Sequence, residues 1–112
     1  MSDCLFCKIV RGEIPATKVA ESAECLAFRD IQPQAEVHVL VIPKTHYSSM
    51  NDIADAAVVG AMSMLAKEVA AAEGVDASGY RLVINTGKQG GQSVDHVHMH
   101  VLGGRQMQWP PG

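Results

Sequence analysis

Residues 94–102 read Val94-Asp95-His96-Val97-His98-Met99-His100-Val101-Leu102, and this stretch constrains the fold more than any other. Polar and apolar side chains alternate along it, and a period of two predicts a strand with one buried face. The three histidines would then point to one side of the strand, while the valines and methionine between them face the core. Three of the chain's five histidines lie in this pattern.

The clustering of histidines has three interpretations. It is a polar strand face that happens to use histidine, a metal site made of three imidazoles, or a catalytic strand. Strict alternation of so rare a residue favours catalysis. A neutral imidazole can attack phosphorus near pH 7, and a second imidazole on the same face can stabilise charged phosphoryl oxygens.

A glycine-rich loop, residues 87–93, leads directly into this strand. Glycines let backbone N–H groups turn inward and approach an anion closely. Such a loop taken alone usually means a hairpin turn. Its position before the histidines places a phosphate held by the loop beside a row of imidazoles.

The rest of the chain predicts an α+β fold. A helix is predicted over residues 53–73, with an apolar stripe of Val58, Met62, Leu65 and Val69. Asn51 or Asp52 would cap its start and Gly74 its end. Residues 6–11 form a short helix closed by Gly12. Strands are predicted at residues 17–21, 25–29, 37–42 and 81–84. The order places one short and one long helix on a five-stranded, mostly antiparallel sheet.

Composition sets broad limits on function. The 112 residues suit a single domain, 1–112, and the net charge of −3 without a Lys/Arg run gives no sign of a nucleic-acid or membrane partner. No apolar run approaches the ~20 residues of a membrane helix, and the first ten residues lack the features of a signal peptide. Three cysteines are an odd count, which fits a reducing cytoplasm better than a disulfide-built secreted fold.

Several stretches together carry a family resemblance. Residues 90–105, from Gly90-Gly91-Gln92-Ser93 through the three histidines to Gly103-Gly104-Arg105, resemble the signature of the histidine-triad (HIT) superfamily. The ending, residues 103–112, resembles the tail of its Hint branch. Residues 28–35 and 40–44 also resemble Hint sequences. The resemblance covers nearly the whole chain. It implies a HIT-like fold and a purine nucleoside phosphoramidase that binds nucleotides such as AMP or GMP.

The resemblance also implies roles for individual residues. His98 would be the nucleophile that takes the nucleotidyl group, and no metal is needed for that step. His100 would bind phosphate oxygens, with His38 as a further histidine at the site, and Ser93 would serve the leaving nitrogen. Gly91 and the Ser93 backbone would cradle the α-phosphate. The remaining nucleotide contacts would come from Asn85 near the phosphate, Asp30 at the ribose hydroxyls, and Ile9, Ile14, Phe28, Ile31 and Leu40 around the base.

A structural zinc site is a further implication. Cys4 and Cys7 form a Cys-x2-Cys pair, which by itself fits either a redox motif or two buried thiols. With His46 and His96 the pair resembles the four ligands of zinc-bearing members of the superfamily. Two thiolates and two imidazoles make a closed tetrahedral site. The third cysteine, Cys25, is predicted to be buried in a strand.

Three other functions compete with the phosphoramidase. A cupin-like metal oxygenase also uses His-x-His, but it needs an acidic ligand that residues 99–112 lack, and it needs a many-stranded jelly roll. A non-catalytic nucleotide-binding or scaffold module is a second alternative, but the sequence keeps every catalytic position, so it shows no cause for a loss of activity. Dinucleoside polyphosphate hydrolysis stays within the superfamily, and only the Hint-like tail argues against it.

The C-terminal tail, residues 106–112, together with the Hint resemblance, implies a homodimer. It carries the chain's only tryptophan, Trp109, and two stiffening prolines without a helix or strand pattern. An exposed indole gains nothing from solvent, so Trp109 is expected to pack against something. The Hint resemblance implies that the tail lies near the active site of a neighbouring subunit.

Overall fold

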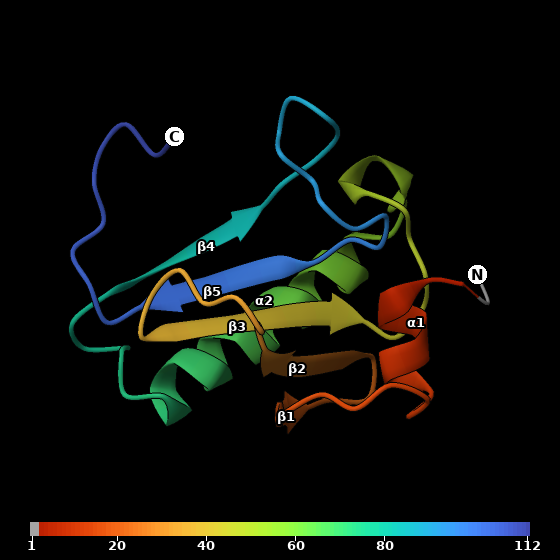
Figure 1. Cartoon of the computed structure of the whole chain (residues 1–112), viewed down its shortest axis with the longest axis horizontal. Helices are drawn as coiled ribbons and strands as arrows, with labels where there is room; N and C mark the ends of the chain where they lie inside the picture. Colours follow the sequence, from red (N-terminus) through yellow and green to blue (C-terminus); the bar gives the residue numbers. More distant parts are fainter. Residues whose placement is uncertain (1–2) are drawn as a thin grey trace.

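A five-stranded antiparallel sheet forms the middle layer of the fold in the computed structural model, which describes residues 3–112 (Figure 1). In chain order the elements are α1 (Leu5–Val10), β1 (Lys18–Glu21), β2 (Cys25–Arg29), β3 (Val37–Pro43), the 3-10 helix η1 (Met50–Asp52), α2 (Ala56–Ala72), β4 (Tyr80–Ile84) and β5 (Met99–Gly103). The strand order is β1-β2-β3-β5-β4. The predicted α+β class and order of elements are confirmed.

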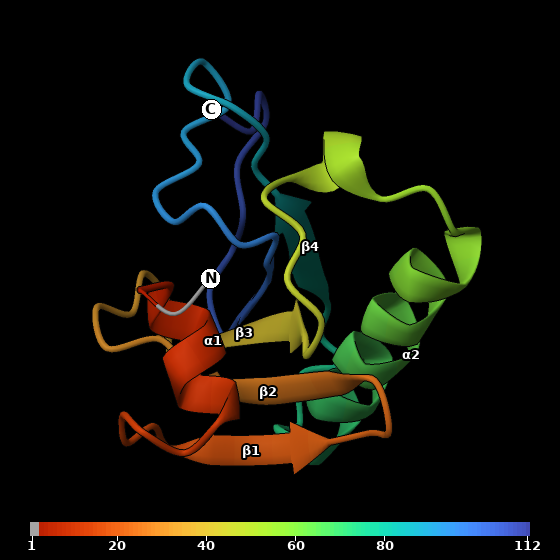
Figure 2. The same cartoon turned by 90° about the vertical axis from the view of Figure 1, so that its right-hand side faces the viewer.

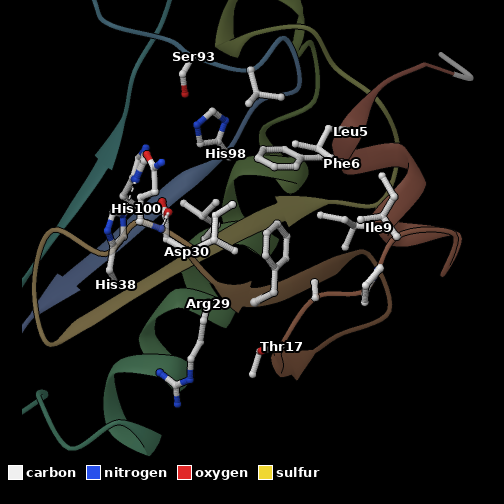
Figure 3. A pocket seen from close by; sticks show the side chains of 18 of the residues that line it. Leu5, Phe6, Ile9, Thr17, Arg29, Asp30, His38, Ser93, His98 and His100 are labelled. Atoms are coloured by element: carbon white, nitrogen blue, oxygen red, sulfur yellow. Dashed lines mark hydrogen bonds and ion pairs between the residues drawn. The ribbon is translucent and has the colours of Figure 1, made fainter.

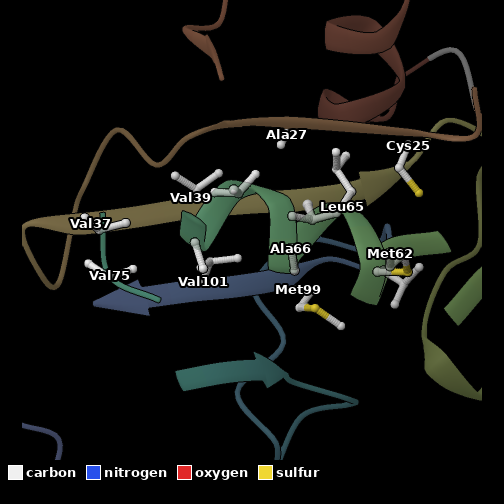
Figure 4. Close-up of a cluster of buried hydrophobic side chains, with 14 residues drawn as sticks. Cys25, Ala27, Val37, Val39, Met62, Leu65, Ala66, Val75, Met99 and Val101 are labelled. Carbon is white, nitrogen blue, oxygen red and sulfur yellow. The ribbon is translucent and has the colours of Figure 1, made fainter. Parts of the chain in front are cut away.

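Both faces of the central strands are covered, because side chains alternate along them. Val39 and Val41 of β3 face α2, in a core that also contains Met62 and Leu65 (Figure 4). Leu40 and Ile42 face the opposite side, where they pack with Phe6 of α1. Figure 2 shows α1 and α2 on opposite sides of the sheet. The predicted burial of Cys25 is confirmed.

The long helix begins later than predicted. The prediction that Asn51 or Asp52 caps it is wrong, because these residues belong to η1, which Ser49 caps in a reciprocal pair with Asp52. Asp55 caps α2 instead, since its carboxylate accepts a hydrogen bond from the Ala57 N–H. At the other end Gly74 takes a φ of 76°, the left-handed geometry predicted for it. The predicted stripe is buried at Met62, Leu65 and Val69 and half-buried at Val58.

The histidine strand is shorter than the predicted range, residues 94–102. In the register that pairs Val41 with Met99, Pro43 would lie opposite Val97, and proline has no N–H to donate. The Val97 N–H donates instead to the carbonyl of Tyr47 at 2.7 Å. The alternation nevertheless continues through the irregular segment, because Val97, Met99 and Val101 all lie in the α2-side core. The boundaries of α1, β1, β2, β3 and β4 agree with the predictions to within one residue, and those of β2 agree at both ends.

The C-terminal tail lies beside β4. The Arg81 guanidinium donates to the carbonyl of Gln108 at 2.9 Å, and this contact joins the tail to the strand. Trp109 is 82% exposed, so the surface against which it is expected to pack does not lie within residues 3–112 of the same chain. Within residues 3–112, no helix has both the length and the apolar character needed to cross a bilayer.

Candidate active site

A cavity of about 920 Å³ opens on the face of the sheet that carries α1 (Figure 3). All the predicted catalytic and nucleotide-binding residues line it except Asn85 and Gly91. Those that line it are His38, Ser93, His98, His100, Asp30, Ile31, Ile9, Ile14, Phe28 and Leu40. The volume lies within the range of small-molecule sites, roughly 300–1,000 Å³. The fold therefore gathers residues from both ends of the chain around one cavity.

The His98 ring is held in a fixed orientation. Its Nδ1 lies 2.8 Å from the carbonyl oxygen of His96, which can only accept, so Nδ1 carries the proton and Nε2 keeps its lone pair. The edge of the Phe6 ring packs against it, with ring centroids 5.2 Å apart. Figure 3 shows the Ser93 hydroxyl directed toward this ring. His98 is only 3% exposed, so water has little access to it.

His100 is linked to His38 through a directed hydrogen bond. The backbone N–H of Gln34 donates to Nδ1 of His38 at 3.0 Å, which leaves the His38 proton on Nε2. That Nε2 lies 2.8 Å from Nδ1 of His100 and donates to it. The remaining Nε2–H of His100 is buried and has no partner within the described chain. Burial, with His98 and His38 adding to it, lowers the pKa of His100 to about 4, so the ring is neutral at pH 7.

Asp30 completes the polar end of the cavity. One of its oxygens lies 3.4 Å from Nε2 of His38, and the other accepts the backbone N–H of Gln32 at 2.8 Å. The other end is apolar, with Ile9, Ile14 and Phe28 in the wall. The cavity therefore offers imidazoles and a carboxylate at one end and hydrocarbon at the other.

Ile31 lies at the rim and is 94% exposed.

The loop that leads into the histidines is built as a tight turn. Gly91 has a φ of 79°, which favours glycine, and its N–H donates to the carbonyl of Lys88 at 3.1 Å. A Cβ at Gly90 would lie 2.3 Å from the backbone oxygen of Thr86. Gly91 and the half-buried Asn85 lie outside the cavity lining, so their phosphate contacts stay predictions.

Phe6 is the main lining residue that the sequence did not predict. Its ring contacts His98, His96 and Phe28, at centroid distances of 5.2, 5.8 and 5.5 Å. The only signal for it was indirect. Phe6 lies between Cys4 and Cys7. A metal site that joins those cysteines to His96 therefore also brings Phe6 close to His98.

The four predicted metal ligands come together in one cluster, all with ligand atoms within 4.8 Å of one another. The Cys4 sulfur lies 3.4 Å and the Cys7 sulfur 3.6 Å from Nδ1 of His96, and Cys7 lies 3.3 Å from Nδ1 of His46. A tetrahedral ion with Zn–S of about 2.3 Å and Zn–N of about 2.0 Å would separate sulfur and nitrogen by about 3.5 Å. The separations therefore fit a zinc-sized ion.

The outer contacts of this cluster also fit a metal. Nε2 of His96 donates to the carbonyl of Pro43 at 2.8 Å, which fixes the proton there and frees Nδ1 as a ligand. Burial lowers the pKa of His96, which favours the neutral, ligating form. Burial and the neighbouring Cys4 raise the pKa of the Cys7 thiol, and a cation between the sulfurs would oppose that effect.

A second group, Asp30, His38 and His100, is close enough to suggest a metal but does not fit one. His38 could bind a cation through Nε2 only with a proton on Nδ1, and Nδ1 already accepts the N–H of Gln34. The 2.8 Å between the two imidazole nitrogens is also shorter than the roughly 3.3 Å expected for two nitrogens on one zinc ion. We therefore assign these imidazoles to a hydrogen-bonded pair.

The sheet with helices on both faces, together with alternating histidines at its centre, defines a histidine-triad fold. Residues 11–107 match the HIT domain family, and the chain belongs to that family. An uncharacterized HIT-like protein of Synechococcus elongatus is 51% identical, over 98% of this chain and 97% of that protein.

Solved structures support the same assignment. A HIT family hydrolase from Legionella pneumophila is 54% identical, with a TM-score of 0.94, over 98% of this chain and all of that one. A zinc-bound histidine triad family protein from Mycobacterium smegmatis is 35% identical, with a TM-score of 0.79, over 93% of this chain and 76% of that one.

Proposed function

We propose that this chain is a Hint-branch enzyme that hydrolyses the P–N bond of purine nucleoside 5′-phosphoramidates. One observation carries the proposal. His98 presents an oriented Nε2 lone pair beside His100, whose buried Nε2–H has no partner in the described chain. A nucleophile next to an unpaired donor suits attack on an oxyanion-bearing centre such as phosphorus.

In the first step Nε2 of His98 attacks the α-phosphorus and forms a P–N bond to the imidazole. The bond from phosphorus to the substrate's amine breaks, and the amine takes a proton through the solvent-exposed hydroxyl of Ser93. His100 donates its Nε2–H to a phosphoryl oxygen, where negative charge builds up. In the second step water attacks phosphorus, the imidazole leaves, and the mononucleotide is released with a proton.

The two ends of the cavity suit the two ends of a nucleotide. The apolar wall near Phe28 would receive the purine, and a carboxylate such as Asp30 can accept both ribose hydroxyl hydrogens. The cavity is large enough for a mononucleotide. Within residues 3–112 the one Lys or Arg that lines it is Arg29, whose guanidinium pairs with Glu73 at 2.7 Å, and this scarcity of free cations favours a phosphoramidate over a longer polyphosphate chain.

We also propose that Cys4, Cys7, His46 and His96 hold a structural zinc ion. The chain is proposed to form a single domain, residues 1–112, and to be a cytoplasmic homodimer. When bound, the ion supplies a cross-link between α1 and the histidine segment and takes no part in the reaction. The free state of the three cysteines is consistent with a reducing compartment.

A direct assay tests the proposed activity. Purified protein is given adenosine and guanosine 5′-phosphoramidates beside a dinucleoside polyphosphate, and mononucleotide and amine are measured. We expect turnover of the phosphoramidates with little cleavage of the polyphosphate. Faster polyphosphate cleavage would make the chain a dinucleoside polyphosphate hydrolase, and binding without turnover of either would make it a binding module.

A further inference from the structure

The hydrogen bond between His38 and His100 could run in either direction, and the direction decides what His100 offers to the cavity. When His38 donates, His100 keeps its proton on Nε2 and presents a donor. In the reverse arrangement His100 carries its proton on Nδ1, donates it to His38, and presents the lone pair of Nε2 to the cavity. An anion would be bound by the first arrangement and repelled by the second.

The backbone amide of Gln34 selects the first arrangement. It lies 3.0 Å from Nδ1 of His38, and an amide N–H can only donate. Reversal would move the His38 proton to Nδ1, where it would face the Gln34 N–H as a second donor. A doubly protonated His38 would meet the same conflict. Because Nε2 of His38 then donates across the 2.8 Å contact to Nδ1 of His100, the His100 proton lies on Nε2.

Gln34, in the loop between β2 and β3, is itself held by a residue from another part of the chain. The Nε–H of Arg105, just beyond β5, donates to the Gln34 carbonyl at 3.0 Å. The Gln34 side chain donates to the carbonyl of Gln32 at 3.1 Å, within the same loop. The N–H and the C=O of Gln34 are therefore both engaged, so the peptide units on either side of its Cα are restrained.

We propose that the Gln34 backbone amide, held by Arg105, is a positioning group that sets the proton on Nε2 of His38 and so makes His100 an anion donor. The inference rests on the proposed function, because it assigns a role toward a bound phosphate. It adds two residues that touch neither the nucleophile nor the reacting bond.

NMR spectroscopy of the wild-type protein tests the proton positions without substrate. We expect imidazole ¹⁵N shifts of an Nε2–H tautomer for both His38 and His100 at pH 7. A trans-hydrogen-bond coupling should join the Gln34 amide nitrogen to Nδ1 of His38. A proton on Nδ1 of His38 would overturn the proposal.

Two variants of one residue separate the amide from the side chain. Gln34→Pro removes the N–H, whereas Gln34→Ala keeps it and serves as the matched control. We expect Gln34→Pro to show a mixture of His38 tautomers and to bind AMP roughly ten- to a hundred-fold more weakly, the range for a lost bond to a charged group. Gln34→Ala should keep the wild-type tautomers and bind AMP within about two-fold of wild type. Equal behaviour of the two variants would overturn the proposal.

Circular dichroism shows whether Gln34→Pro folds. If it does not, Arg105→Met provides a second test. Loss of the Arg105 contact should give a detectable Nδ1–H population in His38 and several-fold weaker AMP binding. Wild-type spectra and affinity in this variant would remove Arg105 from the mechanism. Failure of the wild-type protein to bind AMP would count against the proposed function, while the tautomers would still decide the positioning role.

Discussion

The carbonyl oxygen of His96 lies 2.8 Å from Nδ1 of His98, while the His96 ring faces the sulfurs of Cys4 and Cys7. One residue therefore contributes its side chain to the candidate metal cluster and its backbone to the candidate nucleophile. The ring of Phe6, which lies between the two cysteines, packs against both histidines. A change in the cluster consequently has a short path to the active site.

Replacement of His98 by alanine should abolish turnover and leave the fold intact. Val97 and Met99 supply the core packing of this segment on the opposite face, so the sheet does not depend on the imidazole. Loss of a covalent nucleophile should lower kcat by ~10⁴ or more, equivalent to about 5 kcal/mol of transition-state stabilisation. Mass spectrometry of quenched wild-type enzyme should find a nucleotide on His98. Near-normal turnover by His98→Ala would exclude it as the nucleophile.

Purified protein should carry close to one zinc ion per chain. Replacement of both Cys4 and Cys7 by serine should remove the metal and lower the melting temperature, because α1 loses its cross-link. Much of the activity should survive, with any loss appearing in kcat through the contacts of His96 and Phe6. Elemental analysis gives the metal content. Cys25→Ala is the matched control and should retain the ion, since Cys25 lies in the core outside the cluster.

Stability should fall as the pH drops from 6.5 toward 4. Burial lowers the pKa of His100 to about 4, so between these values the unfolded chain binds a proton that the folded chain does not. Unfolding is therefore favoured by acid, with a slope of at most about 1.4 kcal/mol per pH unit from one group. Urea denaturation across this range should give a shallower slope for His100→Asn. Equal slopes for the two proteins would contradict the buried, neutral state of His100.

Gly90→Ala should reduce turnover more than stability. The new Cβ would lie 2.3 Å from the Thr86 backbone oxygen, so the loop must move, and Ser93 lies three residues further along it. Kinetics and thermal melts measure the two effects. Gly60→Ala is the control, because its Cβ meets nothing within 4 Å on α2, and the change should stabilise the helix by about 0.5–1 kcal/mol. Unchanged kinetics in Gly90→Ala would show that the loop does not position Ser93.

Deletion of residues 106–112 should leave a folded protein with altered selectivity among phosphoramidates. Trp109 is 82% exposed in the single chain, which is unfavourable for an indole unless a second subunit covers it. The edge strand β4 is likewise available for pairing across a two-fold axis. Sedimentation of the full chain should give about twice the monomer mass of 11.9 kDa. A monomer at micromolar concentration, or unchanged kinetics after deletion, would contradict the dimer.

Features that repeat along one segment could be predicted from the amino-acid pattern alone. The alternation of His96, His98 and His100 with apolar residues predicted which side chains face the α1 side of the sheet and which face α2. This was possible because side-chain direction has a fixed period within a strand, and it held even where the strand was interrupted. The order of helices and strands was readable for the same reason, since periodicity is a local property.

Contacts between distant segments depend on how the whole chain packs, so they could not be predicted from local patterns. The interruption before Met99 follows from the register that would put Pro43 opposite Val97, which no local pattern shows. The contact of Phe6 with His98 likewise depends on where α1 docks. The Gln34 amide could not be singled out at all, because every residue except proline carries the same N–H. Its role comes from where the folded chain holds it, 3.0 Å from a nitrogen that must accept.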